Sequence, residues 1–150
     1  MHAVTIKLSI NAPRDVVLKE FADYTHAPIL HRKHVKSVRE LERFYNVSTA
    51  LWRIKILGVW SSAIQKQTVF PPGRLVNETI TGIASGTMED TCLSERSGGT
   101  NIVDTIEVRT RGWARPLERI VAAYARAIAE EILLDYKRDL ESRFSAEENR

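Results

Sequence analysis

Residues 116–144 read PLERIVAAYARAIAEEILLDYKRDLESRF and form the longest periodic stretch of the chain. Apolar side chains recur in it at steps of three and four residues, which is the spacing of one face of an α-helix. This apolar stripe consists of Leu117, Val121, Tyr124, Ile128, Ile132, Tyr136 and Leu140, widened by Ile120 and Leu133. A helix with such a continuous apolar face must lie on an apolar surface, so the fold depends on what the preceding residues offer.

The residues before this helix favour β-strands. Val4, Ile6, Leu8 and Ile10 alternate with polar residues, as in a strand with one buried face. From about residue 35 to residue 108, short extended runs alternate with turn signals, which is typical of an antiparallel meander of about six strands. The turn signals are Tyr45-Asn46, Gly58, Pro71-Pro72-Gly73, the stretch from Gly82 to Gly86, and Ser97-Gly98-Gly99.

A short helix is predicted between the first strand and the meander. Pro13 suits the first helical turn, where no backbone donor is needed, and Asn11 is a residue type that caps such a turn. Val17, Phe21 and Tyr24 then recur at helical steps. We therefore expect an amphipathic helix that begins near Pro13, with Asn11 as its cap.

The composition is that of one ordinary globular domain. The chain has 150 residues and a mass of 17.0 kDa, with 43% hydrophobic and 27% charged residues, so we expect residues 1–150 to form a single domain. No apolar run approaches the roughly 20 residues that cross a bilayer, which favours a soluble protein. The N-terminal alternation is typical of a strand and not of an export signal, so a cytoplasmic location is expected.

The charge distribution argues against nucleic acid as a partner. A net charge of +3 and a pI near 9.2 are mildly basic, but lysine and arginine are spread along the chain. The sequence has neither a basic stripe with interleaved aromatic residues nor a recognisable reading motif. We therefore expect no nucleic-acid partner.

The order of the predicted elements indicates an α+β fold. A curved antiparallel sheet wrapped on the long helix would bury both apolar faces, and the glycines at Gly58 and from Gly82 to Gly86 mark bulges or tight bends that help the sheet to curve. One helix, about 10 Å wide, cannot fill the whole concave face of such a sheet. The gap between helix and sheet is the expected ligand cavity.

Three segments, in this order and spacing, resemble the START-related, polyketide-cyclase and birch-allergen-like superfamily (SRPBCC). They are INAPRDVVLKEFADY (residues 10–24), SGGT (97–100) and KRDLE (137–141). The resemblance implies a helix-grip fold, in which a seven-stranded antiparallel sheet curls around the C-terminal helix and encloses an apolar pocket. Members bind lipids, sterols, quinones, polyketides or plant hormones, and some are cyclases, aromatases or dehydratases. The chain most resembles small cyclase/dehydrase and coenzyme-Q-binding members, but lacks the tryptophan that many of them carry near His31.

On these grounds the sequence predicts binding or transport of a small hydrophobic or amphipathic ligand, such as a lipid, a quinone or a polyketide-like compound, without a cofactor. Large apolar residues of the connecting segment, the meander and the long helix are the expected ligand contacts. They are Ile29, Leu30, Trp52, Ile54, Trp60, Tyr124 and Ile128. The aromatic residues among them have a second interpretation, because burial in an ordinary core would use them equally well.

An enzyme that uses the same pocket is the alternative. A cyclase, dehydratase or aromatase needs an acid or base with a shifted pKa and a group that stabilises the developing enolate. The candidate catalytic residues are His31 or His34 as base, Glu78 or Asp104 if they face inward, and Arg53 as oxyanion partner. Charged residues on antiparallel strands usually face solvent, so the direction of each side chain decides this hypothesis.

The stretch HAPILHRKH (residues 26–34) contains three histidines, which raises the question of a metal site. His31 and His34 are three residues apart, but His26 precedes Pro28, and the stretch has no cysteine or carboxylate to complete a ligand set. Nearby cations would also repel a metal ion. The sequence therefore predicts no metal, and places these residues at the cavity entrance. A third hypothesis is that the basic rim binds a membrane or a partner through Arg32, Lys33, Lys36 and Arg39.

Overall fold

The computed structural model describes residues 2–148, and the side chains of residues 2–145. Strands and helices follow one another in the order expected for an α+β chain. They are β1 (His2–Ile10), α1 (Arg14–Ala22), the 3-10 turn η1 (Tyr24–His26), α2 (Ala27–Leu30), β2 (Val35–Phe44), β3 (Val47–Ile56), β4 (Val59–Phe70), β5 (Arg74–Thr79), β6 (Met88–Arg96), β7 (Gly99–Val108), the 3-10 turn η2 (Gly112–Leu117) and α3 (Glu118–Glu148).

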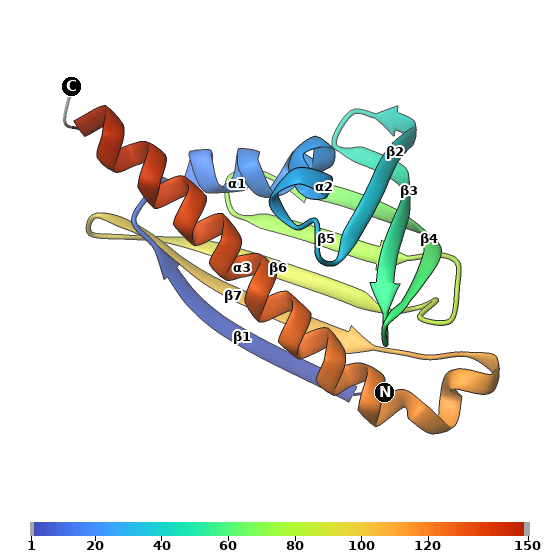
Figure 1. Ribbon diagram of the computed structural model, residues 1–150. Helices are drawn as coiled ribbons and strands as arrows, with labels where there is room; N and C mark the ends of the chain where they lie inside the picture. Colours follow the sequence, from blue (N-terminus) through green and yellow to red (C-terminus); the bar gives the residue numbers. More distant parts are fainter. Residues whose placement is uncertain (1, 149–150) are drawn as a thin grey trace.

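Within the described part of the chain, seven strands form one antiparallel sheet in the order β1-β7-β6-β5-β4-β3-β2. The sheet curls, and α3 lies across its concave side (Figure 1). β2 has two irregularities of register, between Val35 and Ser37 and between Glu40 and Glu42, and such irregularities bend a strand locally. The predicted sheet and its long C-terminal helix are confirmed.

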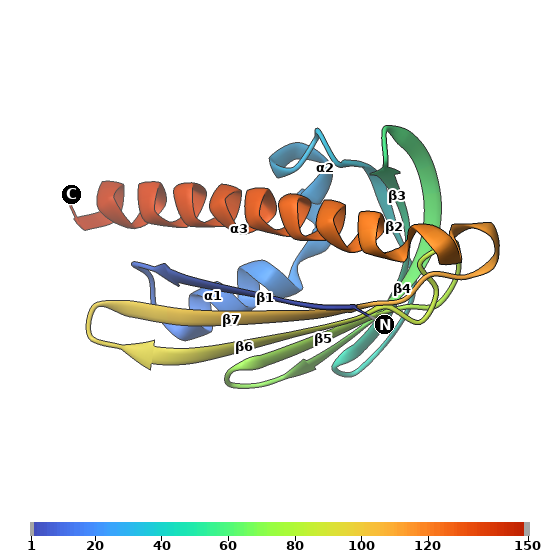
Figure 2. The same cartoon turned by 90° about the horizontal axis from the view of Figure 1, so that it is seen from below.

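The apolar stripe of α3 packs mainly on the side of the sheet formed by β1 and β7, as Figure 2 shows from below. Ile10, Ile102 and Leu140 are almost completely buried there, together with Val17 of α1. Each such side chain contributes roughly 1.5–3 kcal/mol through burial. This half of the concave face is therefore a filled core. No helix among residues 2–148 is long and apolar enough to span a membrane.

The start of α1 differs from the sequence prediction. Pro13 occupies the capping position, without a side-chain hydrogen bond to the helix. Asn11 instead joins distant parts of the chain: its backbone N–H donates to Glu141 Oε1 at 3.0 Å, and its Oδ1 accepts from Arg96 Nη2 at 2.5 Å. The prediction of Asn11 as a cap was wrong, because two long-range partners use the residue.

Two glycines have conformational roles at the edges of the sheet. Gly58 follows Leu57 in the turn between β3 and β4, and both residues have positive φ, 82° and 49°. This is the backbone of a tight two-residue hairpin. Gly99 lies against β1, where a Cβ atom would come within 2.4 Å of the backbone oxygen of Ile10. The glycines thus serve the architecture, as the sequence suggests.

Candidate functional site

A cavity of about 280 Å³ lies between α3 and the half of the concave face that α3 does not pack against. Strands β3 to β7 form its floor, α3 forms its roof, and α1 and the segment around α2 close one side. This volume is near the lower end of the range of small-molecule sites, about 300–1,000 Å³. The cavity is therefore large enough for a compact organic molecule.

The floor of the cavity is polar. Alternate residues of β4, β5 and β6 point inward, and their side chains lie beside one another across the strands. These polar lining residues are Gln65, Gln67, Asn77, Thr79, Glu89 and Thr91. A polar group on the concave face of a sheet is costly unless it finds a hydrogen-bond partner. Some of these groups have partners in the protein, such as Gln67 with the backbone oxygen of Ala22 and Thr91 with Asp104, and the apolar roof supplies none to the others.

The roof and side walls of the cavity are apolar and aromatic. From α3, Ala125, Ile128 and Tyr136 face the cavity, and Phe21 and Trp52 line the sides. The rings of Phe21 and Tyr136 lie 4.6 Å apart between centroids. An amphipathic molecule would fit such a space with its apolar body toward α3 and its polar end toward the floor.

His31 is buried in the cavity wall and is only 3% exposed. Its Nδ1 lies 3.2 Å from Asp135 Oδ2 on α3, and its ring stands edge-on to Tyr136. Burial lowers the pKa of His31, so the ring is neutral at neutral pH. Because a carboxylate only accepts, Nδ1 carries the hydrogen and Nε2 keeps a lone pair, which has no hydrogen-bond partner among the described residues.

The other two histidines of this segment have separate surroundings. His34 also lines the cavity, and its Nε2 lies 2.6 Å from Glu131 Oε2. His26 faces outward and lies 3.5 Å from Glu20. Within residues 2–148, no three histidine, cysteine, aspartate or glutamate side chains gather closely enough to hold a metal ion.

Asp104 and Glu89 form a carboxyl pair at the boundary between the filled core and the cavity. Asp104 on β7 is completely buried, and its Oδ1 accepts from Thr91 Oγ1 at 2.9 Å. Glu89 lines the cavity and is in hydrogen-bond contact with Asp104. Burial, and then the neighbouring Asp104 charge, raise the pKa of Glu89 well above its ordinary value. Burial also raises the pKa of Asp104. Two touching carboxyl groups in such a setting resist ionising together.

Glu89 was not anticipated from the sequence. In β6, Glu89 and Asp90 are adjacent, so either direction of the strand places one acid inward. Asp90 faces outward and accepts from Arg74 at 2.7 Å, which leaves Glu89 inside. The available signal was the alternation with Thr91 and Leu93, both of which are buried.

Three of the expected ligand contacts lie outside the cavity. Ile29 is 78% exposed, and Leu30 borders a shallow outer groove with Arg32 and Lys33. Trp60 faces the outer side of the sheet, where the Nζ atoms of two lysines, Lys36 and Lys55, lie over its ring at 5.9 and 5.7 Å. The structure corrects the expectation for these three residues, because α2 turns its apolar side chains outward and inward positions of β4 are odd-numbered.

Trp52, Ile54, Tyr124 and Ile128 do line the cavity. The hydroxyl of Tyr124 donates to the backbone oxygen of Lys55 at 3.4 Å, so it has a partner within the protein. The lining therefore combines sequence-expected apolar residues with polar residues of the floor, such as Gln65 and Gln67.

Two of the catalytic candidates are turned away from the cavity. Arg53 lies between the inward residues Trp52 and Ile54 and is exposed. Glu78 lies on the outer face of β5, in a depression on that side of the sheet. Because successive side chains of a strand point to opposite faces, neither residue can act on a ligand in the cavity. The structure thus corrects both expectations, while His31, His34 and Asp104 remain at or beside the cavity.

The basic rim is solvent-exposed. Arg32, Lys33, Lys36 and Arg39 all lie at the surface, and Lys36 contacts Trp60 as described above. Glu131 and Asp135 of α3 lie beside this segment through their contacts with the two histidines. The carboxylates partly offset the positive charge of the rim.

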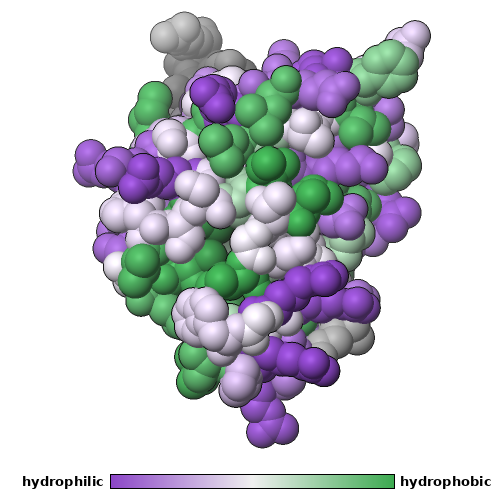
Figure 3. Space-filling model, turned by 90° about the vertical axis from the view of Figure 1, so that its right-hand side faces the viewer, coloured by the Kyte–Doolittle hydropathy of each residue, from purple (hydrophilic) through white to green (hydrophobic). Residues whose placement is uncertain are grey.

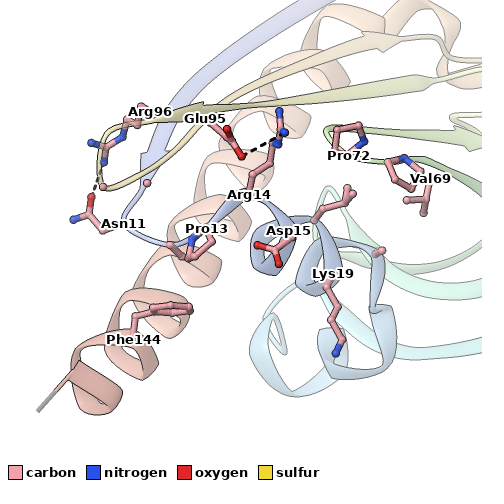
Figure 4. A pocket seen from close by; sticks show the side chains of 16 residues that line it. Asn11, Pro13, Arg14, Asp15, Lys19, Val69, Pro72, Glu95, Arg96 and Phe144 are labelled. Carbon is pink, nitrogen blue, oxygen red and sulfur yellow. Dashed lines mark hydrogen bonds and ion pairs between the residues drawn. The ribbon is translucent and has the colours of Figure 1, made fainter. Parts of the chain in front are cut away.

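A second hollow, of about 790 Å³, lies at the other end of the molecule between α1, the β6–β7 turn and the end of α3 (Figure 4). It is an open surface groove. Both of its arginines have partners, with Arg14 Nη2 at 3.4 Å from Glu95 Oε1 and Arg96 bound to Asn11. The enclosed cavity, whose wall contains unpartnered polar atoms, is the better candidate site.

The cavity extends toward the end of the molecule that carries the β3–β4 turn, since Ile56, Ala84 and Val121 are among its lining residues. Figure 3 views this end, where hydrophobic side chains gather in the middle of the face and hydrophilic ones along its margins. Val59 and Trp113 are largely exposed. This end of the cavity is therefore bordered by apolar surface.

Comparison of the sequence with protein-family models and with curated proteins finds no match. Solved structures, in contrast, superpose well. The aromatase/cyclase Zhui from Streptomyces sp. R1128 gives a TM-score of 0.79 at 15% identity, with 91% of this chain and 94% of that one covered. A START superfamily protein from Mycobacterium smegmatis gives a TM-score of 0.67 at 16% identity, with 95% of this chain and 97% of that one covered. The chain has the helix-grip fold.

The helix-grip neighbours include more than one kind of protein. The di-domain ARO/CYC protein StfQ of the steffimycin biosynthetic pathway gives a TM-score of 0.81 at 14% identity over 95% of this chain. The chain spans about half of that protein, 52% of its length. The resemblance inferred from the sequence is thus confirmed as a resemblance of fold, and the choice between ligand carrier and enzyme depends on the site itself.

Proposed function

We propose that the protein binds a small amphipathic molecule in the cavity between α3 and the β4–β6 floor. The observation that carries the proposal is the contrast within one cavity, with apolar and aromatic side chains on the roof and a group of polar side chains in the middle of the floor opposite. A ligand with an apolar body and one polar end satisfies both surfaces. The presence of a START superfamily protein and of aromatase/cyclases among the helix-grip neighbours supports a binding role.

A pair of alanines on α3 tests this proposal. Ala125 lines the cavity, whereas Ala127, two residues later, is exposed. Ala125→Trp should fill part of the cavity and weaken binding of 2-(2-naphthyl)ethanol at least about tenfold, while Ala127→Trp should leave it unchanged. Isothermal titration calorimetry and native mass spectrometry would measure the binding. Equal affinities of the two variants would contradict the proposal, provided that circular dichroism shows both to be folded.

A second candidate function, favoured by the His31–Asp135 pair, is proton transfer of the cyclase or dehydratase type. A neutral imidazole whose Nδ1–H is held by a carboxylate, and whose Nε2 is free and buried in a cavity wall, is arranged as a general base. Such a base would remove a proton from the carbon beside a ligand carbonyl. NMR in D2O would detect this as deuterium uptake into the methyl group of 2-acetonaphthone. His31→Gln should lower the rate by about 100-fold or more, and no exchange above the buffer rate would remove this candidate.

A further inference from the structure

The wall of the cavity contains hydrogen-bond acceptors that lack donors. His31 Nε2 is a buried lone pair in the lining and has no hydrogen-bond partner among residues 2–148. Gln67 uses its amide N–H by donating to the backbone oxygen of Ala22 at 2.9 Å, which leaves its amide oxygen as a further acceptor. Buried acceptors without donors are costly, so a ligand that brings donors would be stabilised here.

The carboxyl groups of the floor also lack a lysine or arginine partner in the cavity. Glu89 and Asp104 are in contact in a buried setting, and burial raises the pKa of both carboxyl groups. Of the lysines and arginines in the described chain, Lys55 alone borders the cavity, and its Nζ lies outside, over Trp60. His31 is neutral, as described above. A negative charge on this pair would therefore have no lysine or arginine partner in the cavity, and buried charges are normally paired.

Aromatic rings surround the remainder of the cavity. Phe21, Tyr24, Trp52, Tyr124 and Tyr136 all line it. The faces of aromatic rings attract cations, by about 0.5–2 kcal/mol per contact depending on solvation. Acceptors without donors, a buried carboxyl pair without a lysine or arginine partner, and a ring of aromatic side chains are together complementary to an organic cation.

We propose that the Glu89–Asp104 pair is a recognition site for a protonated amine, and that the ligand is a small amphipathic amine whose apolar body lies among the aromatic side chains under α3. This inference rests on the proposed function, since it requires an occupied cavity. The inference specifies the charge of the ligand. The cavity should select amines, and repulsion from the carboxyl pair should exclude carboxylates such as fatty acids.

Three probes that share one aromatic body test the inference on the unmodified protein. They are 2-(2-naphthyl)ethylamine, 2-(2-naphthyl)ethanol and 2-naphthylacetate, which end in a cation, a neutral hydroxyl and an anion. Calorimetric titration at neutral pH should give the amine at least about tenfold tighter binding than the alcohol, with the carboxylate weakest.

Variants of the pair should remove the selectivity while the cavity remains. Glu89→Gln and Asp104→Asn replace each carboxyl by an amide of the same shape, so the preference for amine over alcohol should fall to about twofold or less, with alcohol binding kept. Glu78→Gln is the matched control, because Glu78 lies on the outer face of the sheet. It should leave the preference intact. If either pair variant fails to fold, the comparison of the three probes on the unmodified protein still tests whether the cavity prefers an amine.

The possible failures are distinguishable. Equal binding of amine and alcohol, or tighter binding of the carboxylate, would overturn the amine site and leave the proposed ligand-binding function standing. Binding of none of the three probes would overturn both. An amine preference that survives Glu89→Gln and Asp104→Asn would overturn the assignment to the carboxyl pair.

Discussion

The concave face of the sheet has two halves that share the helix α3 but differ in what they present to it. Toward β1 and β7 the inward residues are aliphatic, such as Ile6, Ile10 and Ile102, and α3 packs directly on them. From β4 to β6 the residues that line the cavity are amides, hydroxyls and a carboxyl, with Leu75 as the aliphatic exception, and the cavity separates them from the same helix. One helix fills one half of the curved sheet, and the other half stays hollow.

The two halves differ in how their inward side chains affect the free energy of folding. An aliphatic side chain under α3 lowers the free energy of the folded state through burial. A polar side chain such as Gln65 at the same depth does not, unless it has a partner. Polar residues on an interior face are therefore better explained by a ligand than by stability, which is the basis of the proposed site.

The largest expected effect compares one isoleucine from each half. Ile102 is 1% exposed in the filled half, whereas Ile128 borders the cavity. Ile102→Ala should cost about 3–4 kcal/mol of unfolding free energy, and Ile128→Ala about 1 kcal/mol, because the second side chain already faces empty space. Urea unfolding followed by circular dichroism would measure both. Equal losses would show that the two halves are packed alike.

A smaller effect concerns the carboxyl pair. The pKa of Glu89 is raised in the folded state, so its ionisation costs stability as the pH rises above the unfolded value of about 4.5. Glu89→Gln should therefore stabilise the protein by about 1 kcal/mol near pH 7, and this gain should vanish near pH 4. The control Glu78→Gln should change stability by less than about 0.5 kcal/mol at either pH. A loss of stability at neutral pH in Glu89→Gln would contradict the assigned environment.

The smallest effect concerns His31. Its pKa is lowered in the folded state, so the unfolded chain takes up the proton more readily as the pH falls below about 6.5. Between pH 7 and pH 5, the free energy of unfolding of the wild-type protein should fall further than that of His31→Gln, by an extra amount of up to about 1 kcal/mol. Denaturant unfolding at both pH values would measure this. A histidine free of burial in the cavity wall would show no such difference between the two proteins.

The long-range pattern of the sequence predicted the fold because it depends on many residues at once. The apolar stripe from Leu117 to Leu140 and the alternation from Val4 to Ile10 define the helix and one strand, and no single residue decides either. Ends of elements were less predictable. Asn11 has the right chemistry for a cap, but its actual partners, Arg96 and Glu141, are far away in the sequence.

Half of the candidate site could be predicted in the same way. Trp52, Ile54, Tyr124 and Ile128 follow from apolar patterning, whereas the polar floor depends on which face of each strand turns inward. In β6 both possible directions place an acid inside, so the pattern leaves Glu89 undecided. His31 reaches the cavity through its contact with Asp135 on α3, a pairing across 104 residues that no local pattern contains.

The central claim, that the space between α3 and the β4–β6 floor binds a small amphipathic molecule, is tested most directly by an NMR titration of the 15N-labelled protein with 2-(2-naphthyl)ethanol. The account predicts that the backbone amide signals of Thr79, Thr91 and Ala125 shift together and saturate, while those of Arg14 and Glu95 in the outer groove stay in place. Shifts confined to the groove residues, or no saturable shift at all, would contradict it.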